Sequence, residues 1–215
     1  MCKVSVLTPT IRPVGLKTLQ EGLEEQTFQD FEWLVEVGLP NKNGHDLNKA
    51  YNRMLRRAQG EIVVSVQDYI ELQPDSIKMF CRAYEEGKRF CTAPVGKVKG
   101  INYGTNQIKW DWRKSGKVDI EFRDWEIDFA CGSLSAIKDV GGFDEKMDGW
   151  WGFDNVNLAY RLSLHGEKFY NLPDNKAVVL DHNLCTKYPF SDKINKKMYS
   201  KRFEDFKNGL EINYI

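Results

Sequence analysis

The sequence predicts an α/β fold with a doubly wound, mainly parallel sheet and a mixed-sheet C-terminal half. Short β-rich runs alternate with helical patterns through the first half of the chain, and glycine, proline or asparagine separates consecutive runs. This alternation is typical of parallel sheets, whose neighbouring strands need long crossover connections. The second half breaks the alternation, which indicates a different arrangement of strands there.

Three pairs of a strand and a helix make up the first half. In the first helix, Leu16, Leu19 and Leu23 recur at helical spacing. Gly60 ends the second helix, and Pro74 opens the third, where the missing N–H group of proline is tolerated. We expect strands over residues 3–8, 31–37 and 61–66, and helices over residues 15–24, 46–58 and 74–86.

The second half predicts hairpins, loops and further short strands. Residues 96–128 are polar and aromatic, and long irregular insertions of this kind are usually functional. We expect strands within residues 129–137 and 168–181, and a terminal amphipathic helix over residues 192–208. Because no linker or internal repeat interrupts the sequence, we expect a single domain over residues 1–215.

Composition argues against several classes of protein. The 215 residues carry 31 Lys and Arg against 31 Asp and Glu, so no overall basic field favours nucleic-acid binding. The sequence shows no signal-peptide pattern and no run of about 18 apolar residues. Its five cysteines are widely spaced without a C-x-x-C pair, which gives no indication of a zinc site or a disulfide framework. We expect a cytoplasmic protein.

Polar residues stand at the carboxyl ends of the predicted strands, where open parallel sheets bind their ligands. Residues 8–12 follow the first strand, Glu36 ends the second, and Gln67-Asp68-Tyr69 ends the third. A carboxylate at such a place can hold Mg²⁺ or Mn²⁺ against a diphosphate, because hard cations prefer oxygen ligands. Alternatively, Asp68 only caps the turn before Ile70.

The segment 141–162 sets glycines and tryptophans against an acidic residue that opens a predicted helix. The flat faces of Trp150 and Trp151 suit the C–H face of a sugar ring, and Asp154 lies where a hydroxyl substrate can reach it. Each observation has a structural alternative: the tryptophans could be core residues, and Asp154 could be an N-cap. Together they favour a sugar site with a general base.

These segments resemble family 2 glycosyltransferases of the GT-A fold. The likeness is carried by residues 5–10, 19–35, 58–68, 141–145 and 160–162, and it covers roughly residues 3–185. It implies a GT-A-like fold in which residues 1–98 bind the nucleotide-sugar, residues 99–185 bind the acceptor and carry the catalytic group, and residues 186–215 form the C-terminal amphipathic helix.

The resemblance implies a nucleotide-sugar donor, expected to be UDP-linked, and a carbohydrate or glycoconjugate acceptor. Glu36 stands where the family has an Asp that contacts the base, and Asn52 falls near the family's Ala-Arg-Asn segment. Gly132 would set backbone groups against the donor sugar, or it would only form an ordinary turn. The implied donor-binding residues are Pro9, Thr10, Arg12, Glu36, Asn52, Gln67, Asp68 and Gly132.

The resemblance also implies a metal site. Gln67-Asp68-Tyr69 matches the family's D-x-D motif, which binds the metal and the donor diphosphate, but only its middle position is acidic here. His182 lies where such enzymes place a late metal-binding histidine. Asp68 and His182 would therefore hold Mn²⁺ or Mg²⁺, although the altered motif leaves the metal dependence open.

Asp154 is the implied catalytic base. Residues 154–157 correspond to the family's acidic stretch at a helix N-terminus, and Asn155 and Asn157 are amides that cannot accept a proton at neutral pH. Asp148 is a reserve candidate. The implied reaction is a direct displacement in which Asp154 takes the acceptor proton and the acceptor hydroxyl attacks the anomeric carbon, so the linkage is inverted.

Aromatic residues of the insertion are candidates for the same sugar platform as Trp150 and Trp151. Trp110, Trp112 and Trp125 offer large contact area at low entropic cost, but they could instead pack the insertion down.

The C-terminal segment has two interpretations. Residues 187–215 carry seven Lys or Arg against four Asp or Glu, with aromatic residues between them. This pattern permits a weak contact with an anionic membrane surface, or it describes an amphipathic helix that closes the domain with a solvated basic face.

Two other classes of function stay open. Amides in place of acidic residues, at Gln67 and Asn155, are compatible with a catalytically weak module that binds sugar-nucleotides or glycans. A nucleotidyltransferase would use the same nucleotide-binding sheet and release pyrophosphate, but it would need neither the tryptophans of segment 141–162 nor a base at Asp154.

Overall fold

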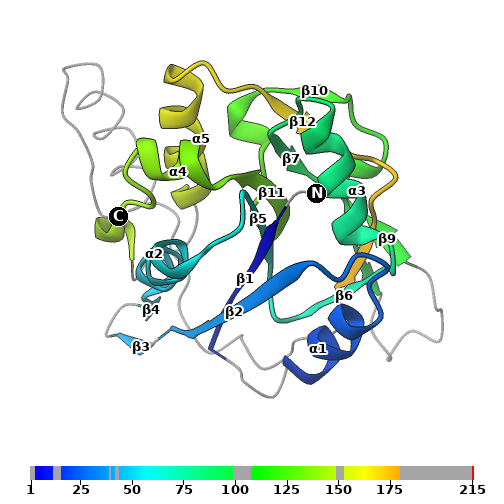
Figure 1. Cartoon of the computed structure of the whole chain (residues 1–215). Helices are drawn as coiled ribbons and strands as arrows, with labels where there is room; N and C mark the ends of the chain where they lie inside the picture. The colour runs from blue at the N-terminus through cyan, green and yellow to red at the C-terminus, as the bar shows by residue number, and fades with distance from the viewer. Residues whose placement is uncertain are drawn as a thin grey trace.

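A computed structural model describes residues 3–11, 16–38, 40–41, 44–98, 108–148, 153–179 and 215. The described chain contains a large sheet with helices on both of its faces, and a smaller sheet beside it (Figure 1). The architecture is the α/β fold that the alternation of strands and helices predicts.

The large sheet has seven strands in the order β10-β12-β7-β11-β5-β1-β2. Strand β1 pairs in parallel with β2 and β5, as the first half of the sequence predicts. Strand β11 lies antiparallel between β5 and β7, which makes the other half of the sheet mixed. The strands are β1 (Val4–Thr10), β2 (Phe31–Val37), β5 (Ile62–Val66), β7 (Phe90–Thr92), β10 (Asp119–Ile120), β11 (Phe129–Ser133) and β12 (Phe169–Asn171).

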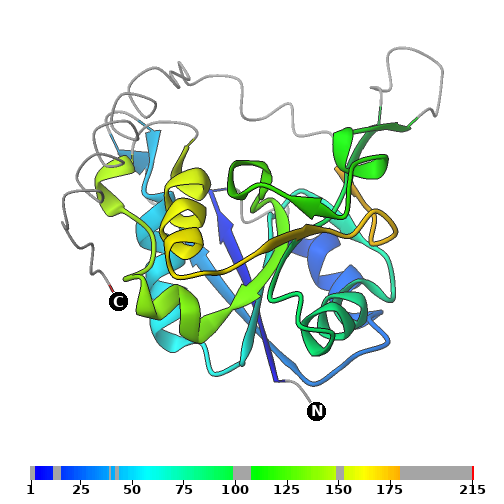
Figure 2. The same cartoon turned by 90° about the horizontal axis from the view of Figure 1, so that it is seen from above.

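Helices cover the two faces of this sheet. Helices α1 (Leu16–Glu24) and α3 (Ser76–Glu85) lie on one face, and α2 (Leu47–Arg57), α4 (Leu134–Asp139) and α5 (Asp154–Leu164) lie on the other (Figures 1 and 2). The alternation of side chains along β1 explains both layers. Val4 and Val6 pack in the cluster with α1 and α3, and Leu7 packs in the cluster with α2, α4 and α5. Burying each such side chain contributes roughly 1.5–3 kcal/mol.

The smaller sheet has the order β6-β13-β8-β9 and lies beside the large one. Its strands are β6 (Ile70–Leu72), β13 (Ala177–Val179), β8 (Val95–Val98) and β9 (Ile108–Trp110). The antiparallel pair of β8 and β9 confirms the hairpin expected in the insertion. Short 3₁₀ turns η3 (Trp112–Lys114), η4 (Phe122–Asp124) and η5 (Glu145–Met147), and a two-residue pair β3 (Pro40–Asn41) and β4 (Gly44–His45), complete the described elements.

Short strands lie within both of the regions predicted for the second half of the chain. The strand expected within residues 129–137 ends at Ser133, because the Ser133 hydroxyl accepts a bond from the N–H group of Ala136 and so caps α4. The region 168–181 holds two three-residue strands, β12 and β13, separated by a turn at residues 173–175. In both places a capping or turn residue within the apolar run ends the strand.

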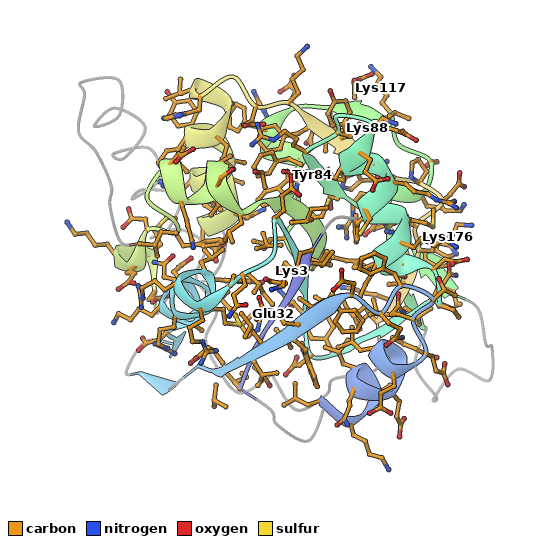
Figure 3. The ribbon with its side chains drawn as sticks, viewed as in Figure 1. Lys3, Glu32, Tyr84, Lys88, Lys117 and Lys176 are labelled. Carbon is orange, nitrogen blue, oxygen red and sulfur yellow. The ribbon has the colours of Figure 1, made fainter. Side chains whose placement is uncertain are left out.

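The amino ends of β1 and β2 are closely packed. Glu32, labelled in Figure 3 together with Lys3, accepts hydrogen bonds at 2.6 Å from the Ser5 hydroxyl and from the N–H group of Gln59. A Cβ atom at Gly60 would lie 2.4 Å from the Ser5 nitrogen, so only glycine fits beside β1. The opposite, carboxyl edge of the sheet is where α/β folds place their ligands.

The expected terminal helix over residues 192–208, and with it the predicted membrane contact, lies outside the described residues. In the part of the chain that the structure describes, every helix is too short or too polar to cross a bilayer.

Candidate active site

Several polar residues meet at the carboxyl edge of β1 and β5. Strand β11 runs antiparallel to β5 with Phe129 opposite Val66, so the residues before β11 lie beside those that follow β5. The N–H group of Gln67 donates to the carbonyl oxygen of Asp128 at 3.1 Å. This register joins the predicted donor-binding segment 67–69 to a segment of the insertion that the sequence analysis did not single out.

Asp68 is held against the end of β1. The Thr10 hydroxyl donates to Asp68 Oδ2 at 2.5 Å, and Asp68 is only 4% exposed. The turn that contains Asp68 is closed by a backbone hydrogen bond, which the Ile70 N–H group donates to the Gln67 carbonyl oxygen. The backbone therefore closes this turn without the Asp68 side chain. The structure thus brings together two predicted donor-binding residues from different strands. Pro9 lies in β1 and is buried, and Arg12 lies outside the described residues.

Residues 125–128, here called the 125–128 bridge, connect this edge to the start of α5. Each of the four carbonyl oxygens of the bridge accepts a hydrogen bond from a different partner. The donors are Asn155 Nδ2 to Trp125 at 2.8 Å, Thr92 Oγ1 to Glu126 at 2.8 Å, Ser65 Oγ to Ile127 at 2.7 Å, and the Gln67 N–H group to Asp128 at 3.1 Å. Since β5, β7 and α5 all contribute, the backbone of the bridge has a fixed position between them.

A buried arginine fixes the end of the bridge. Arg113, 2% exposed, donates to Asp128 in a bidentate pair at 2.7 and 2.9 Å and to Asp111 at 2.6 and 3.0 Å. Burial alone would lower the pKa of Arg113, but the two carboxylates outweigh it and hold that pKa above its ordinary value. The insertion is thereby fastened to the large sheet, and nothing in the sequence pattern singled out Arg113.

Glu126 is the exposed residue of the bridge. The surrounding protein and the charges of Asp128 and Asp154 raise its pKa to about 7, against an opposing effect of Arg113. The pattern of the sequence could not identify this residue, because a single Glu within a polar insertion is unremarkable until the register of β11 places it at the edge.

Asp154 is the first residue of α5. The preceding residue, Phe153, adopts a left-handed conformation with φ of 67°, which is rare for a bulky side chain and occurs mainly at functional sites. Asp154 is therefore inside the helix and not its N-cap. Burial raises the pKa of Asp154, and N–H groups at the start of the helix oppose this rise. A raised pKa brings a carboxylate closer to the basicity that a general base needs.

The amides that follow Asp154 have structural partners. Asn155 holds the bridge through Trp125, and Asn157 Oδ1 accepts a bond from Arg161 Nε at 3.1 Å inside the protein. An acidic residue at position 155 would lose the bond that Asn155 donates, so this amide has a structural explanation. An acidic residue at position 157 could still accept from Arg161, so this contact does not explain the amide there.

Two predicted donor-binding residues contact helix α2 or the loop beside it. Glu36 accepts from Arg53 at 2.9 Å and forms an ion pair with Arg57 at 3.1 Å. Asn52 is fully buried, donates to the Phe143 carbonyl and to Glu145, and accepts from the Phe143 N–H group. Their donor-binding roles stay predictions, and for Asn52 a donor contact would have to replace one of these bonds.

Asp148, the reserve base, caps helix α2. Its two carboxylate oxygens accept from the N–H groups of Asn48 at 2.6 Å and Lys49 at 3.1 Å, whereas the N-cap residue Asp46 makes no side-chain cap bond. Burial raises the pKa of Asp148 to about 6, and the two N–H groups limit this rise. The cap joins residues a hundred positions apart, which no local pattern could reveal.

Gly132 has a different place from the one expected. It lies within β11 opposite Val63, three pairs from the Phe129 end that adjoins the site. A Cβ atom there would lie 2.8 Å from the Phe90 ring, so the close packing of Phe90 accounts for the glycine. The hydroxyl of the next residue, Ser133, accepts from Arg89 at 2.8 Å and lies 3.5 Å from that of Tyr84, labelled in Figure 3. The structure thus gives Gly132 a packing role away from the donor edge.

The tryptophans of the insertion differ in their surroundings. Trp125 is 2% exposed and donates Nε1–H to the Cys91 carbonyl, so it is a core residue and not a sugar platform. Trp110 packs over Gly96, and Trp112 remains 45% exposed. Trp150, Trp151 and His182 lie outside the described residues.

The described residues offer one of the two predicted metal ligands. Among them, no group of three or more His, Cys, Asp or Glu side chains is arranged to hold a metal ion. Asp68 nevertheless fits the usual magnesium site of nucleotide enzymes, where one or two carboxylates and the phosphates of the substrate supply the ligands. A cation at this edge would therefore depend on the substrate for most of its coordination.

Comparison with known proteins identifies the fold. No protein-family model and no curated protein matches the sequence. The fold matches solved structures of the S. aureus protein TarS at 14–16% identity. The S. aureus TarS 1–349 structure has a TM-score of 0.61 at 16% identity over 83% of this chain, and this chain spans 60% of its length.

Two further structures of the same protein were determined with ligands. The complex of TarS 1–349 with UDP-GlcNAc has a TM-score of 0.68 at 16% identity, and it covers 97% of this chain and 68% of that chain. The complex with UDP has a TM-score of 0.64 at 14% identity, with 97% and 75% covered. This chain therefore has the GT-A-type glycosyltransferase fold.

Proposed function

We propose that this chain is a family 2-like, inverting glycosyltransferase that moves a sugar from a UDP-linked donor to a carbohydrate or glycoconjugate acceptor. The proposal is supported by the 125–128 bridge, whose two ends are bonded to Gln67, the neighbour of Asp68, and to Asn155, the neighbour of Asp154. Inverting transfer needs a group at the leaving diphosphate and a base at the acceptor hydroxyl, with the donor sugar between them.

The donor class is supported by the fold neighbours. Crystal structures of S. aureus TarS were determined in complex with UDP and with UDP-GlcNAc. We infer a nucleotide-sugar of the same kind for this chain, bound where Thr10 and Asp68 meet. A divalent cation bound by Asp68 would neutralise negative charge on the leaving diphosphate.

In the proposed reaction, Asp154 accepts the proton of the acceptor hydroxyl as the hydroxyl oxygen attacks the anomeric carbon. The bond from that carbon to the diphosphate oxygen breaks, and the nucleoside diphosphate leaves with the electron pair. Attack from the side opposite the leaving group inverts the anomeric centre. The hydrogen bond from the Asn155 side-chain amide to the Trp125 carbonyl holds the start of α5, and so Asp154, in position for this step.

Binding of UDP tests the donor site. The full chain is titrated with UDP in Mn²⁺, in Mg²⁺ and in EDTA, with Asp68→Asn as the variant and Asp75→Asn, an exposed residue at the start of α3, as the control. We expect the wild type to bind UDP in the two metal buffers. The affinity for UDP should fall about tenfold or more in Asp68→Asn and stay unchanged in Asp75→Asn. Equal affinity for UDP in all three proteins would contradict the proposed role of Asp68.

A further inference from the structure

We propose that Glu126 binds a hydroxyl group of the donor sugar and thereby distinguishes a nucleotide-sugar from a free nucleotide. This inference rests on the proposed function and adds a specificity-determining residue to it.

The position of Glu126 along the bridge carries the argument. In a direct displacement the donor sugar lies between the leaving diphosphate and the acceptor hydroxyl. One end of the bridge is bonded to Gln67, next to Asp68, and the other end is bonded to Asn155, next to Asp154. Glu126 lies in the middle of this segment, and the charges of Asp128 and Asp154, at its two ends, both act on its carboxyl group. This is the position that a contact with the donor sugar requires.

The backbone of Glu126 is held by hydrogen bonds, while its side chain is exposed to a ligand. The Thr92 hydroxyl holds the Glu126 carbonyl oxygen at 2.8 Å, and Thr92 also accepts a bond from the buried Arg113. Trp125 and Phe129 on either side are buried, and Glu126 is exposed. Among the described residues, none forms a hydrogen bond or an ion pair with the Glu126 carboxylate. A fixed, unpaired acceptor at this place suits a sugar hydroxyl donor.

The charges around Glu126 make the contact dependent on pH. Asp128, Asp154 and Asp111 raise the pKa of Glu126 together with the surrounding protein, and Arg113 lowers it. With the pKa at about 7, the carboxyl is largely neutral at pH 5.5 and largely ionised at pH 8.5. The ionised form accepts a stronger, charge-assisted hydrogen bond from a hydroxyl group.

Titration calorimetry with UDP and with UDP-GlcNAc tests this inference. The full chain and Glu126→Gln are compared at pH 5.5 and pH 8.5, with Glu121→Gln as the matched control, because Glu121 lies in the same insertion and its side chain is 67% exposed. At pH 8.5 we expect Glu126→Gln to bind UDP as the wild type does and UDP-GlcNAc about 10- to 100-fold more weakly. At pH 5.5 the difference from wild type should shrink.

Thermal unfolding checks that the variant is folded. Ionisation of Glu126 is unfavourable in the folded state, because its pKa is above the ordinary value, so the loss of stability sets in as the pH rises toward 7. Glu126→Gln should therefore unfold at a temperature no lower than wild type at pH 5.5 and at a higher one at pH 8.5.

The possible failures are distinguishable. If wild type binds UDP and UDP-GlcNAc, but Glu126→Gln weakens both equally or neither, the inference is wrong and the proposed function stands. If wild type binds neither nucleotide at either pH, the proposed UDP-linked donor is wrong, and the inference is overturned with it.

Discussion

Asn52 and Phe143 are joined by a reciprocal pair of hydrogen bonds. Asn52 Nδ2 donates to the Phe143 carbonyl at 3.0 Å, and the Phe143 N–H group donates to Asn52 Oδ1 at 2.9 Å. The Tyr51 ring stacks on the Phe143 ring at 4.7 Å between centroids. Helix α2 is thus fastened to the loop that leads to Asp148.

Removal of this pair should destabilise the fold. Asn52→Ala deletes three hydrogen bonds and leaves the buried backbone groups of Phe143 unpaired, so we expect a loss of about 2–3 kcal/mol in the free energy of unfolding by urea. UDP affinity is measured on the same variant below its unfolding transition. A stability equal to wild type, together with a large loss of UDP affinity, would contradict the structural role and favour donor binding.

Arg113 should be among the most sensitive polar residues of the described chain. Arg113→Met leaves Asp128 and Asp111 without their buried partner, and we expect a loss of about 3–5 kcal/mol in the free energy of unfolding. The control is Arg123→Met, which removes an ion pair whose side chains are 65% and 67% exposed and should cost about 1 kcal/mol or less. Similar losses in the two variants would show that Arg113 is not a buried anchor.

The cap made by Asp148 should have a distinctive pH dependence. Asp148→Asn should lose about 0.5–2 kcal/mol, because an amide replaces only part of the cap. The pKa of Asp148 is raised to about 6 in the folded state, so ionisation of this carboxyl costs stability as the pH rises from 4 to above 6. The advantage of wild type over Asp148→Asn should therefore be larger at pH 4.5 than at pH 7.5.

Urea unfolding at the two pH values checks the sign of this effect. Asp139→Asn is the control, since Asp139 is an exposed residue at the end of α4 and is not among the groups that act on Asp148. An advantage of wild type that grows with pH would mean that the folded state prefers the carboxylate, contrary to the raised pKa.

The order of the strands and helices could be predicted because it depends on local patterns. Leu19 and Leu23 are buried on one face of α1, as their helical spacing predicts, and Val4 and Val6 share one side of β1. The end of β11 could not be predicted from the apolar run 129–137, because a Ser133 cap and a strand residue look alike until the neighbouring backbone is placed.

The site was accessible to sequence reasoning only in part. The contact of Thr10 with Asp68 could be expected, because Thr10 ends β1, Asp68 follows β5, and the carboxyl ends of parallel strands share an edge. Glu126 and Arg113 were missed, because their importance comes from the register of β11 against β5 and from ion pairs across the insertion. The place of Gly132 could not be predicted for the same reason, since its position along β11 depends on that register.

We propose that Asp154 is the base of a sugar transfer. The direct test is UDP release from UDP-GlcNAc in the presence of candidate carbohydrate acceptors, with UDP-GlcNAc affinity measured in parallel. Asp154→Asn keeps the size of the side chain and removes its ability to take a proton. The control is Asp139→Asn. Asp139 is an exposed residue at the end of α4, and α4 follows the Ser133 end of β11, whereas the site adjoins the Phe129 end.

We expect wild type and Asp139→Asn to release UDP at the same rate in the presence of an acceptor. Asp154→Asn should bind UDP-GlcNAc with wild-type affinity and release UDP about 10²- to 10⁴-fold more slowly, because only the proton transfer is lost. Wild-type turnover in Asp154→Asn would contradict the assignment of the base, and UDP-GlcNAc binding without acceptor-dependent turnover in wild type would favour the binding-module alternative.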